Sequence, residues 1–314
     1  MKISQLVGPR TSEVVAAEDP VPGPAQVLVE VLASGVCTSD IGPWLGHDPA
    51  ARPLRLGHEI VGRVVDSGRD AGRWKPGDLV TGLGGEGFAT LAAMDAHAVL
   101  PVPAGIEPAH AIGEPVADLE EALSRTGIRA GDRVAVVGLG FMGLGLVQLA
   151  KRHAPGLLVG VDPDPARRER ALRLGADLVF APDELPEEYR TQTTRAGDAR
   201  LAIVLEATGT TGGLRTAGSL VRPFGTLCVV GYHHTGDAMM DMDLWYKAVT
   251  VVNGFCPDRT RLMAAMRDAL GLIAERRFSY EPLITHRFGL DGVDDAFRTM
   301  TEAGPDFVKG VLVL

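Results

Sequence analysis

The feature that most constrains the fold is a short apolar run followed at once by a glycine-rich turn. Residues 133–137 (RVAVV) are almost wholly apolar, and the next six, Gly138-Leu-Gly-Phe-Met-Gly143, match the pattern G-x-G-x-x-G. Apolar strands of this kind usually lie in parallel sheets covered on both faces. A glycine turn that joins such a strand to a helix, expected here over 144–153, is typical of a dinucleotide-binding fold. The alternative is an ordinary glycine turn followed by an aspartate helix cap.

A carboxylate at the expected distance from this turn indicates which dinucleotide would bind. Asp162 ends the next predicted strand, 157–161, and lies 19 residues after Gly143. A carboxylate there can bind the ribose hydroxyls and repel a 2′-phosphate, which favours NAD over NADP. Arg167 or Arg168 would favour NADP instead if its side chain bound the 2′-phosphate. The alternative is that both are solvated helix residues. The predicted contacts in this region are Gly138, Gly140, Phe141, Met142, Gly143, Asp162 and Arg167.

Strands and helices alternate after residue 117, which predicts a doubly wound α/β domain with a parallel sheet. Two more turns follow predicted strands, at 206–209 and at 231–232. Because ligands bind at the carboxyl ends of parallel strands, we expect Thr208 and Gly231 to contact the cofactor. The alternative for both is an ordinary turn. The pair His233-His234 is a further candidate near the nicotinamide, with no contact at all as its alternative.

The remainder of the chain has a different pattern. The first 105 residues contain short β segments bounded by Pro and Gly, which predict a compact β-rich, barrel-like domain. The tail has one amphipathic helix, 262–273, and then β-rich sequence that we expect to fold back onto the first domain. The predicted domains are therefore 1–116 with 256–314, interrupted by 117–255.

Composition excludes several classes of protein. There are 31 Lys and Arg against 40 Asp and Glu, a formal net charge of −9, which argues against nucleic-acid binding. The three cysteines, without a C-x-x-C pair, exclude a disulfide framework and an all-cysteine zinc knot. We find no secretory signal and no apolar run long enough for a bilayer, and so expect a cytoplasmic protein without a membrane partner.

Three residue types that bind metals precede the dinucleotide-binding region. Cys37 follows a predicted strand, His58 lies 21 residues later, and Glu114 stands just before the α/β domain. A thiolate, an imidazole and a carboxylate make a plausible zinc set with one open position. Each residue alone is more often structural. Their joint appearance ahead of a dinucleotide fold favours a metal site.

At this point the sequence resembles the zinc-dependent alcohol dehydrogenases of the medium-chain dehydrogenase/reductase superfamily. The matching stretches cover nearly the whole chain in family order, and the E-P form of the third metal motif is similar to the sorbitol, polyol and sugar dehydrogenase branch. The stretches are GVCTSD, LGHEIVGRVV, KPGDLV, GFATLAAMDAHAVLPVP, EPVAD, VAVVGLGFMGLGLVQLAK, VDPDPARRERALRLGAD and PLITHRF. The resemblance implies an α/β protein with a GroES-like β-rich catalytic domain and a Rossmann domain.

The resemblance also implies roles for particular residues. Cys37 and His58 would be ligands of one catalytic zinc per chain, with Glu59 and Glu114 as carboxylates that bind the zinc ion at one stage and release it at another. Asp40 would orient His58, and Ser39 would hydrogen-bond the substrate alcohol, so that Ser39, His58 and Asp40 form the catalytic set. Lys309 resembles a family contact to the cofactor phosphates, with a solvated lysine as the alternative.

The sequence departs from the family at three places. Only residues 81–86, without cysteine, stand where the family carries a four-cysteine lobe, so we expect no structural zinc. Thr38 replaces a common glycine beside Cys37. No histidine follows Asp40 closely, and His47 is a candidate substitute in the proton path, unless it is an exposed loop residue.

The resulting hypothesis is an oxidoreductase that uses zinc and NAD to convert a secondary alcohol (a polyol, sugar or cyclitol-like small molecule) to a ketone, or the reverse. One alternative is a reductase of the same superfamily that acts on a C=C or C=N bond of a biosynthetic intermediate. Another is a non-catalytic NAD-binding sensor or structural protein. By resemblance we expect a homodimer through residues 249–254, or a homotetramer.

Overall fold

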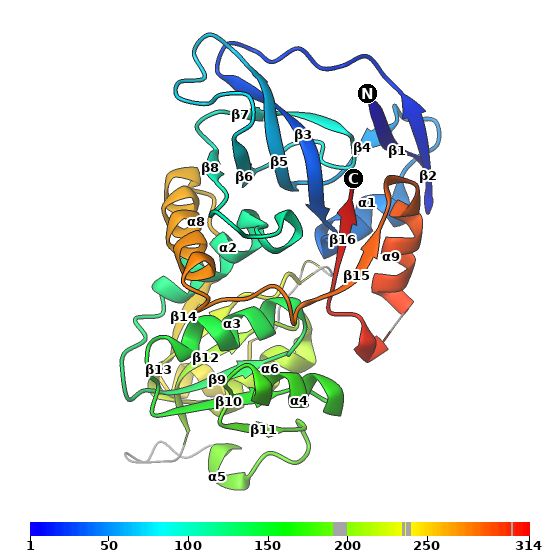
Figure 1. Ribbon diagram of the computed structural model, residues 1–314. Coiled ribbons are helices and arrows are strands. Elements are labelled where there is room, and N and C mark those ends of the chain that lie inside the picture. The colour runs from blue at the N-terminus through cyan, green and yellow to red at the C-terminus, as the bar shows by residue number, and fades with distance from the viewer. Residues whose placement is uncertain (191–199, 234–235, 237–239, 303) are drawn as a thin grey trace. The chain divides into compact units, whose positions relative to one another are not determined.

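The computed structural model describes residues 1–190, 200–233, 236, 240–302 and 304–314 (Figure 1). The chain divides into two compact units, one of residues 1–117 and 266–314 and one of residues 118–265. Residues 256–265, which the sequence analysis grouped with the tail, thus belong to the second unit.

The second unit is a parallel sheet with helices. In the described residues its strand order is β11-β10-β9-β12-β13-β14, and every pairing is parallel. The strands are β9 (Arg133–Val137), β10 (Leu157–Val161), β11 (Leu178–Phe180), β12 (Leu201–Glu206), β13 (Val221–Val229) and β14 (Thr250–Asn253). The helices are α3 (Phe141–Lys151), α4 (Pro165–Arg173), α5 (Glu187–Arg190), α6 (Thr211–Leu220) and α7 (Asp243–Tyr246), together with most of α2 (Gly113–Ser124) and the start of α8 (Arg259–Ala274).

The sequence explains this arrangement. All six residues of β12 are buried, as expected for a strand covered on both faces. Pro165 begins α4, and the Asp164 side chain accepts hydrogen bonds from two of its first N–H groups, those of Ala166 and Arg167. The strand order reverses between β9 and β12, which is where doubly wound sheets open a crevice for a ligand.

The first unit is rich in antiparallel strands. Its larger sheet has the order β15-β16-β3-β5-β6-β8, with β7 paired to β3, and its smaller sheet has the order β2-β1-β4. The strands are β1 (Lys2–Gly8), β2 (Thr11–Ala16), β3 (Gln26–Gly35), β4 (Leu54–Arg55), β5 (Glu59–Ser67), β6 (Leu79–Leu83), β7 (Leu91–Asp95), β8 (Val99–Pro101), β15 (Ile284–Phe288) and β16 (Lys309–Val313). The helices are the short turns η1 (Thr38–Asp40), η2 (Pro108–His110), η3 (Leu290–Gly292) and η4 (Gly304–Asp306), with α1 (Ile41–Gly46) and α9 (Val293–Glu302).

The tail joins the first sheet. β16 pairs antiparallel with the end of β3, so that Val311 lies opposite Gly35. Val27 and Val29 of β3 pack with Ile60 and Val64 of β5 in one apolar core. The predicted fold class, a β-rich part combined with a doubly wound α/β part, is confirmed. No helix in the described part of the chain has the length and apolar character that a bilayer crossing requires.

Candidate functional site

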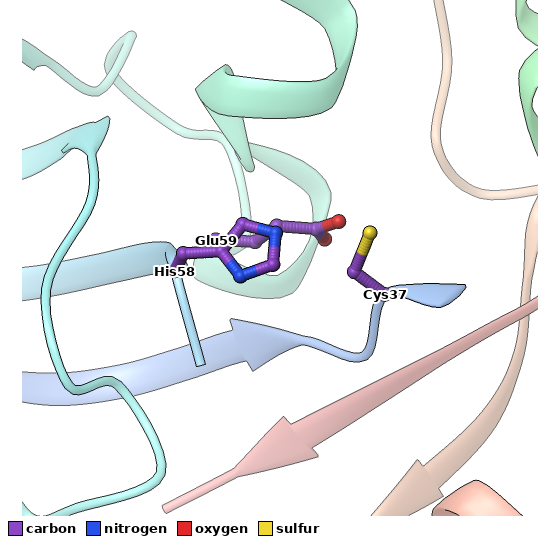
Figure 2. Close-up of side chains that lie close together, drawn as sticks. All are labelled: Cys37, His58 and Glu59. Carbon is purple, nitrogen blue, oxygen red and sulfur yellow. The ribbon is translucent and has the colours of Figure 1, made fainter. Parts of the chain in front are cut away.

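Strand pairing brings three metal-binding side chains together in the first unit. β3 and β5 are antiparallel, with Gly35 opposite Glu59. Because one strand runs up where the other runs down, the residues just past the end of β3 face those just before β5, which places Cys37 beside His58. The ligand atoms of Cys37, His58 and Glu59 all lie within 4.8 Å of one another. Figure 2 shows the Cys37 sulfur directed toward the imidazole and the carboxylate.

Gly35 leaves the space that the Glu59 side chain occupies. A Cβ atom at position 35 would lie only 1.7 Å from Oε2 of Glu59. Any larger residue at the end of β3 would therefore displace the carboxylate. The compact arrangement depends on a glycine opposite Glu59 as much as on the ligand residues.

Two further predicted residues adjoin this cluster. Oδ1 of Asp40, a buried residue, lies 3.6 Å from Nδ1 of His58. The exposed Ser39 hydroxyl lies 3.2 Å from the Cys37 sulfur, to which it donates a hydrogen bond. The structure thus brings both predicted partners to the cluster.

The predicted fourth candidate, Glu114, lies in the first turn of α2 and is half-buried. It is not one of the three residues whose ligand atoms lie within 4.8 Å of one another. Its charge nevertheless contributes to raising the pKa of His58. Of the two carboxylates considered in the sequence analysis, Glu59 is the one within the cluster.

Sequence reasoning missed the partner of Glu59. Nζ of Lys309 lies 2.7 Å and 2.6 Å from the two oxygens of Glu59 and donates to the carbonyl oxygen of Val36 at 3.0 Å. Lys309 is only 4% exposed, so the alternative that it is a solvated lysine is wrong. The pKa of Lys309 is raised because, although burial lowers it, the nearby charges of Glu59 and Cys37 favour the ammonium form. Only the β16–β3 pairing, which sequence does not reveal, brings residue 309 here.

The surroundings of His58 favour positive charge. Burial lowers the pKa of His58, but the neighbouring Asp40 and Cys37 side chains and the charge of Glu114 outweigh it and raise the pKa to about 11. A thiol, an imidazole and a buried carboxylate are the donor types of a zinc site. The residues present therefore fit a zinc ion both in donor chemistry and in the sign of the local charge.

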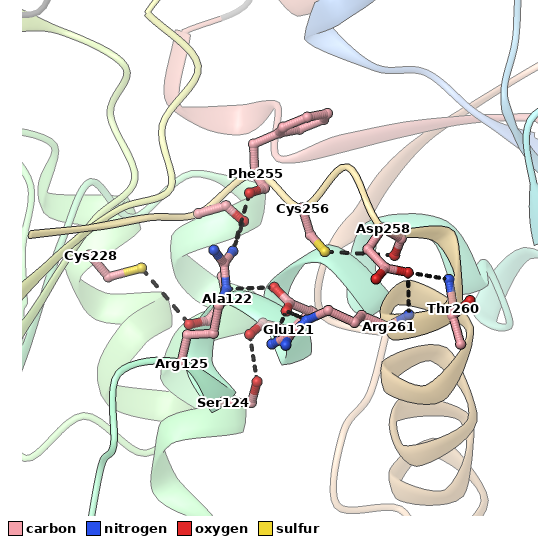
Figure 3. Close-up of polar contacts among 11 residues, drawn as sticks. Glu121, Ala122, Ser124, Arg125, Cys228, Phe255, Cys256, Asp258, Thr260 and Arg261 are labelled. Atoms are coloured by element: carbon pink, nitrogen blue, oxygen red, sulfur yellow. Dashed lines mark hydrogen bonds and ion pairs between the residues drawn. The ribbon is translucent and has the colours of Figure 1, made fainter.

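The other two cysteines lie in the second unit. Cys228 and Cys256 are buried, and their sulfurs face the carbonyl oxygens of Ala122 and Asp258 at 3.9 Å and 3.7 Å. They adjoin an ion-pair network in which buried Glu121 binds Arg125 at 2.8 Å and Arg261 at 2.6 Å (Figure 3).

The glycine-rich turn of the second unit is shaped by close backbone contacts. Gly138 has φ +91°, and a Cβ there would lie 2.6 Å from Cγ2 of Thr208. A Cβ at Gly143 would lie 1.7 Å from the Gly138 carbonyl oxygen, whereas one at Gly140 would meet nothing within 4 Å. Gly140 is the N-cap of α3, and Phe141 and Met142 are its first residues, whose N–H groups favour an anion.

Asp162 is joined to this turn. Its Oδ2 accepts a hydrogen bond from the Leu139 N–H at 2.8 Å, and its Oδ1 accepts one from the Asp164 N–H at 2.9 Å. Nη1 of Arg167 lies 3.9 Å from Oδ2. Nη1 of Arg168 is engaged by the carbonyl oxygens of Asp162 and Pro163, both at 2.8 Å. The carboxylate and Arg167 therefore lie together beside the turn.

A buried carboxylate holds the two later turns. Oε1 of Glu206, at the end of β12, accepts hydrogen bonds from the N–H groups of Thr208 and Gly209 at 2.6 Å and 3.0 Å. Its Oε2 lies 3.3 Å from Nε2 of His233, and its carbonyl oxygen accepts from the Gly231 N–H at 2.9 Å. Thr208 and Gly231 thus lie beside each other at the carboxyl edge of the sheet. His234 falls outside the described residues.

Comparison with known proteins agrees with both units. Residues 23–104 match the family model described as "Alcohol dehydrogenase GroES-like domain", and residues 142–275 match "Zinc-binding dehydrogenase". The chain is 28% identical over 315 residues to a sorbitol dehydrogenase of Halalkalibacterium halodurans, covering 90% of both chains. It is 32% identical over 268 residues to a Mycobacterium tuberculosis protein named "Probable zinc-binding alcohol dehydrogenase", covering 74% of this chain and 68% of that protein.

A solved structure shares the fold. Galactitol-1-phosphate dehydrogenase from Escherichia coli superimposes with a TM-score of 0.85 at 22% identity, covering 100% of both chains. The predicted GroES-like and Rossmann parts are thereby confirmed. The chain belongs to the zinc-binding alcohol dehydrogenase family of the medium-chain dehydrogenase/reductases and is an NAD(P)-dependent oxidoreductase.

Proposed function

We propose that this protein oxidises a secondary alcohol of the polyol, sugar or cyclitol type to a ketone with NAD, or catalyses the reverse reduction, using one zinc ion per chain. The observation that carries the proposal is the cluster of Cys37, His58 and Glu59 in a chain that also has the dinucleotide turn. The relatives named sorbitol dehydrogenase and galactitol-1-phosphate dehydrogenase support the substrate class.

The residues of the cluster would divide the work. Cys37 and His58 would hold the metal together with Glu59 or Glu114. When bound, the metal supplies a Lewis acid for the alcohol oxygen and the cofactor supplies a hydride acceptor. Ser39 is exposed beside Cys37, and its hydroxyl would hydrogen-bond the substrate alcohol, taking up the alcohol proton while it passes its own proton on to solvent. Asp40 would fix the orientation of the His58 ring through Nδ1.

The two carboxylates would not have equal roles. Glu59 is paired through both oxygens with Lys309, so binding a metal would require it to give up part of this ion pair. Glu114 lies at the start of helix α2, and its negative charge contributes to raising the pKa of His58. We therefore propose that Glu114 is the standing third ligand and that Glu59 exchanges with it.

For the cofactor we propose NAD rather than NADP. Asp162 is 3% exposed and accepts a hydrogen bond from the turn itself, and its charge would repel a 2′-phosphate bound beside the turn. Arg167 is the residue that could offset this charge. The contacts would come from Gly138, Gly140, Phe141, Met142, Gly143, Asp162, Arg167, Thr208 and Gly231.

The experiment that tests the function combines a metal assay with a substrate panel. The purified protein should contain about one zinc per chain, and sorbitol, other polyols, sugars and cyclitols should be screened with NAD for NADH formation. Zinc near one per chain together with turnover of a polyol would support the proposal. Absence of zinc, or turnover confined to C=C or C=N substrates, would contradict it and favour the reductase; NAD binding without turnover would favour a sensor.

We also propose that a second copy pairs with β14 to form a dimer. β14 is the last strand in the described sheet, and Val251 on it is 37% exposed. The neighbouring Trp245, Tyr246 and Phe255 are 72%, 68% and 76% exposed. The edge strand of the described sheet, with exposed aromatic residues beside it, would offer a surface on which a second copy could pair. Sedimentation should give at least twice the mass of one chain, and Val251→Lys should shift it toward the monomer; a wild-type monomer would refute the dimer. A cytoplasmic location stays a prediction.

A further inference from the structure

A buried hydroxyl links the two elements that carry Glu59 and Glu114. Thr81, in the middle of β6, has no exposed surface. Its Oγ1 donates a hydrogen bond to the Ile60 carbonyl oxygen at 2.9 Å and accepts one from the Gly113 N–H at 2.8 Å. Ile60 follows Glu59, and Gly113 precedes Glu114. The Thr81 hydroxyl therefore bridges the backbone next to Glu59 and the backbone next to Glu114.

The contact with Gly113 is also the start of a helix. The first N–H groups of a helix have no partner within the helix, and a nearby oxygen usually satisfies them. Here the oxygen comes from a different element, β6, so the cap fixes where α2 begins in space. The packing is close as well, because a Cβ at Gly113 would lie 2.9 Å from Cγ2 of Thr81 and 2.8 Å from Sδ of Met266.

A second buried hydroxyl holds the adjoining residue. The Tyr280 side chain, 1% exposed, donates a hydrogen bond to the Ile112 carbonyl oxygen at 2.5 Å. Residues 112 and 113 are thus fixed by two side chains from two other segments. The backbone that leads into Glu114 has little freedom to move.

We propose that Thr81 is a positioning residue of the metal centre, whose hydroxyl sets the place of Glu114 relative to the Cys37, His58 and Glu59 cluster. This inference rests on the proposed zinc function. Residues that orient metal ligands without touching the metal change metal affinity when they are removed. Thr81 acts through backbone rather than through the ligand side chains, which distinguishes it from Asp40.

The test is the pair of variants Thr81→Val and Thr81→Ser in the full chain, measured with Zn²⁺ alone and with Co²⁺ alone. Thr81→Val keeps the shape but removes the oxygen, and the Zn²⁺ dissociation constant from chelator competition should rise about 10-fold or more. The Co²⁺ absorption bands should shift, because they report ligand geometry. Thr81→Ser keeps the oxygen and should restore both readouts to nearly the wild-type values.

Thr126→Val is the matched control. Thr126 is also buried, donates to the Leu123 carbonyl oxygen at 2.7 Å and accepts from the Ile128 N–H at 3.3 Å, but it lies in the second unit. It should lose comparable stability and leave Zn²⁺ affinity unchanged. If Thr81→Val does not fold, Tyr280→Phe tests the same backbone segment and should also weaken Zn²⁺ binding.

The outcomes separate this inference from the proposed function. A wild-type chain that binds no Zn²⁺ would overturn the function. A wild-type chain that binds Zn²⁺, with Thr81→Val matching it in affinity and in the Co²⁺ spectrum, would overturn only the positioning role. Failure of Thr81→Ser to restore binding would overturn it too, because the hydroxyl would then not be the group that matters.

Discussion

The two candidate sites are built in opposite ways. The metal cluster consists of side-chain atoms of Cys37, His58 and Glu59, brought together by antiparallel pairing between β3 and β5. The cofactor turn consists mainly of backbone, in which Gly138 and Gly143 are needed for the absence of a side chain. The metal cluster should therefore lose its metal when a side chain is removed. The cofactor turn should lose cofactor binding when a side chain is added. This contrast can be tested directly.

The largest effect is expected from Cys37→Ala or His58→Ala. Either change removes a proposed ligand, so bound zinc should be lost and turnover should fall by more than about 100-fold, the most that loss of a residue supporting a ligand costs. NADH binding, measured by fluorescence, should persist because the turn lies in the other unit. Normal activity in either variant, or after chelation of the wild type, would contradict the assignment.

Lys309→Met should destabilise the first unit strongly. It leaves the carboxylate of Glu59, 1% exposed, buried without its cation, and breaking such a pair costs about 3–5 kcal/mol. Chemical unfolding of the zinc-free protein would measure the change. The matched control is Lys151→Met. In the wild type, Nζ of Lys151 lies 3.0 Å from Oδ1 of Asp177, and because both side chains are exposed this ion pair contributes only about 0–1 kcal/mol. Equal effects in the two variants would show that burial of the pair does not matter.

Gly143→Ala and Gly140→Ala should separate stability from cofactor binding. The added methyl at 143 would collide with the Gly138 carbonyl, costing about 1–3 kcal/mol of stability, and should weaken NADH binding. The methyl at 140 has space around it but stands where the pyrophosphate is expected, so it should weaken NADH binding alone. Unchanged NADH affinity in both variants would argue against a dinucleotide at this turn.

The smallest effect concerns cofactor choice. Asp162→Asn removes the negative charge and keeps one acceptor oxygen, for the N–H of either Leu139 or Asp164. The ratio of kcat/KM for NADP to that for NAD should rise about 10-fold, or about 1.4 kcal/mol. Arg167→Ala in the same background should reverse part of the gain if that guanidinium meets the 2′-phosphate. A wild type that already prefers NADP would refute the role of Asp162.

The local pattern was sufficient wherever neighbouring residues decide the outcome. The apolar run 133–137 and the glycine turn predicted β9 and α3, and the alternation that follows predicted the parallel sheet. Cys37 and His58 were found because their motifs carry the ligand types, and the structure brings them together. Lys309 was not assigned to Glu59, because 250 residues separate them and no local signal records the pairing of β16 with β3.

The amino-acid sequence alone defines the available chemistry: a thiol, an imidazole and carboxylates ahead of a dinucleotide turn, in a chain with net charge −9. Which of these groups come into contact depends on the packing of distant segments. This packing placed Glu59 rather than Glu114 within the cluster, gave Glu59 a buried lysine, and connected the two carboxylate-bearing segments through Thr81. The reason is physical: residue types follow from a local pattern, whereas strand register and helix capping between elements depend on how distant segments pack.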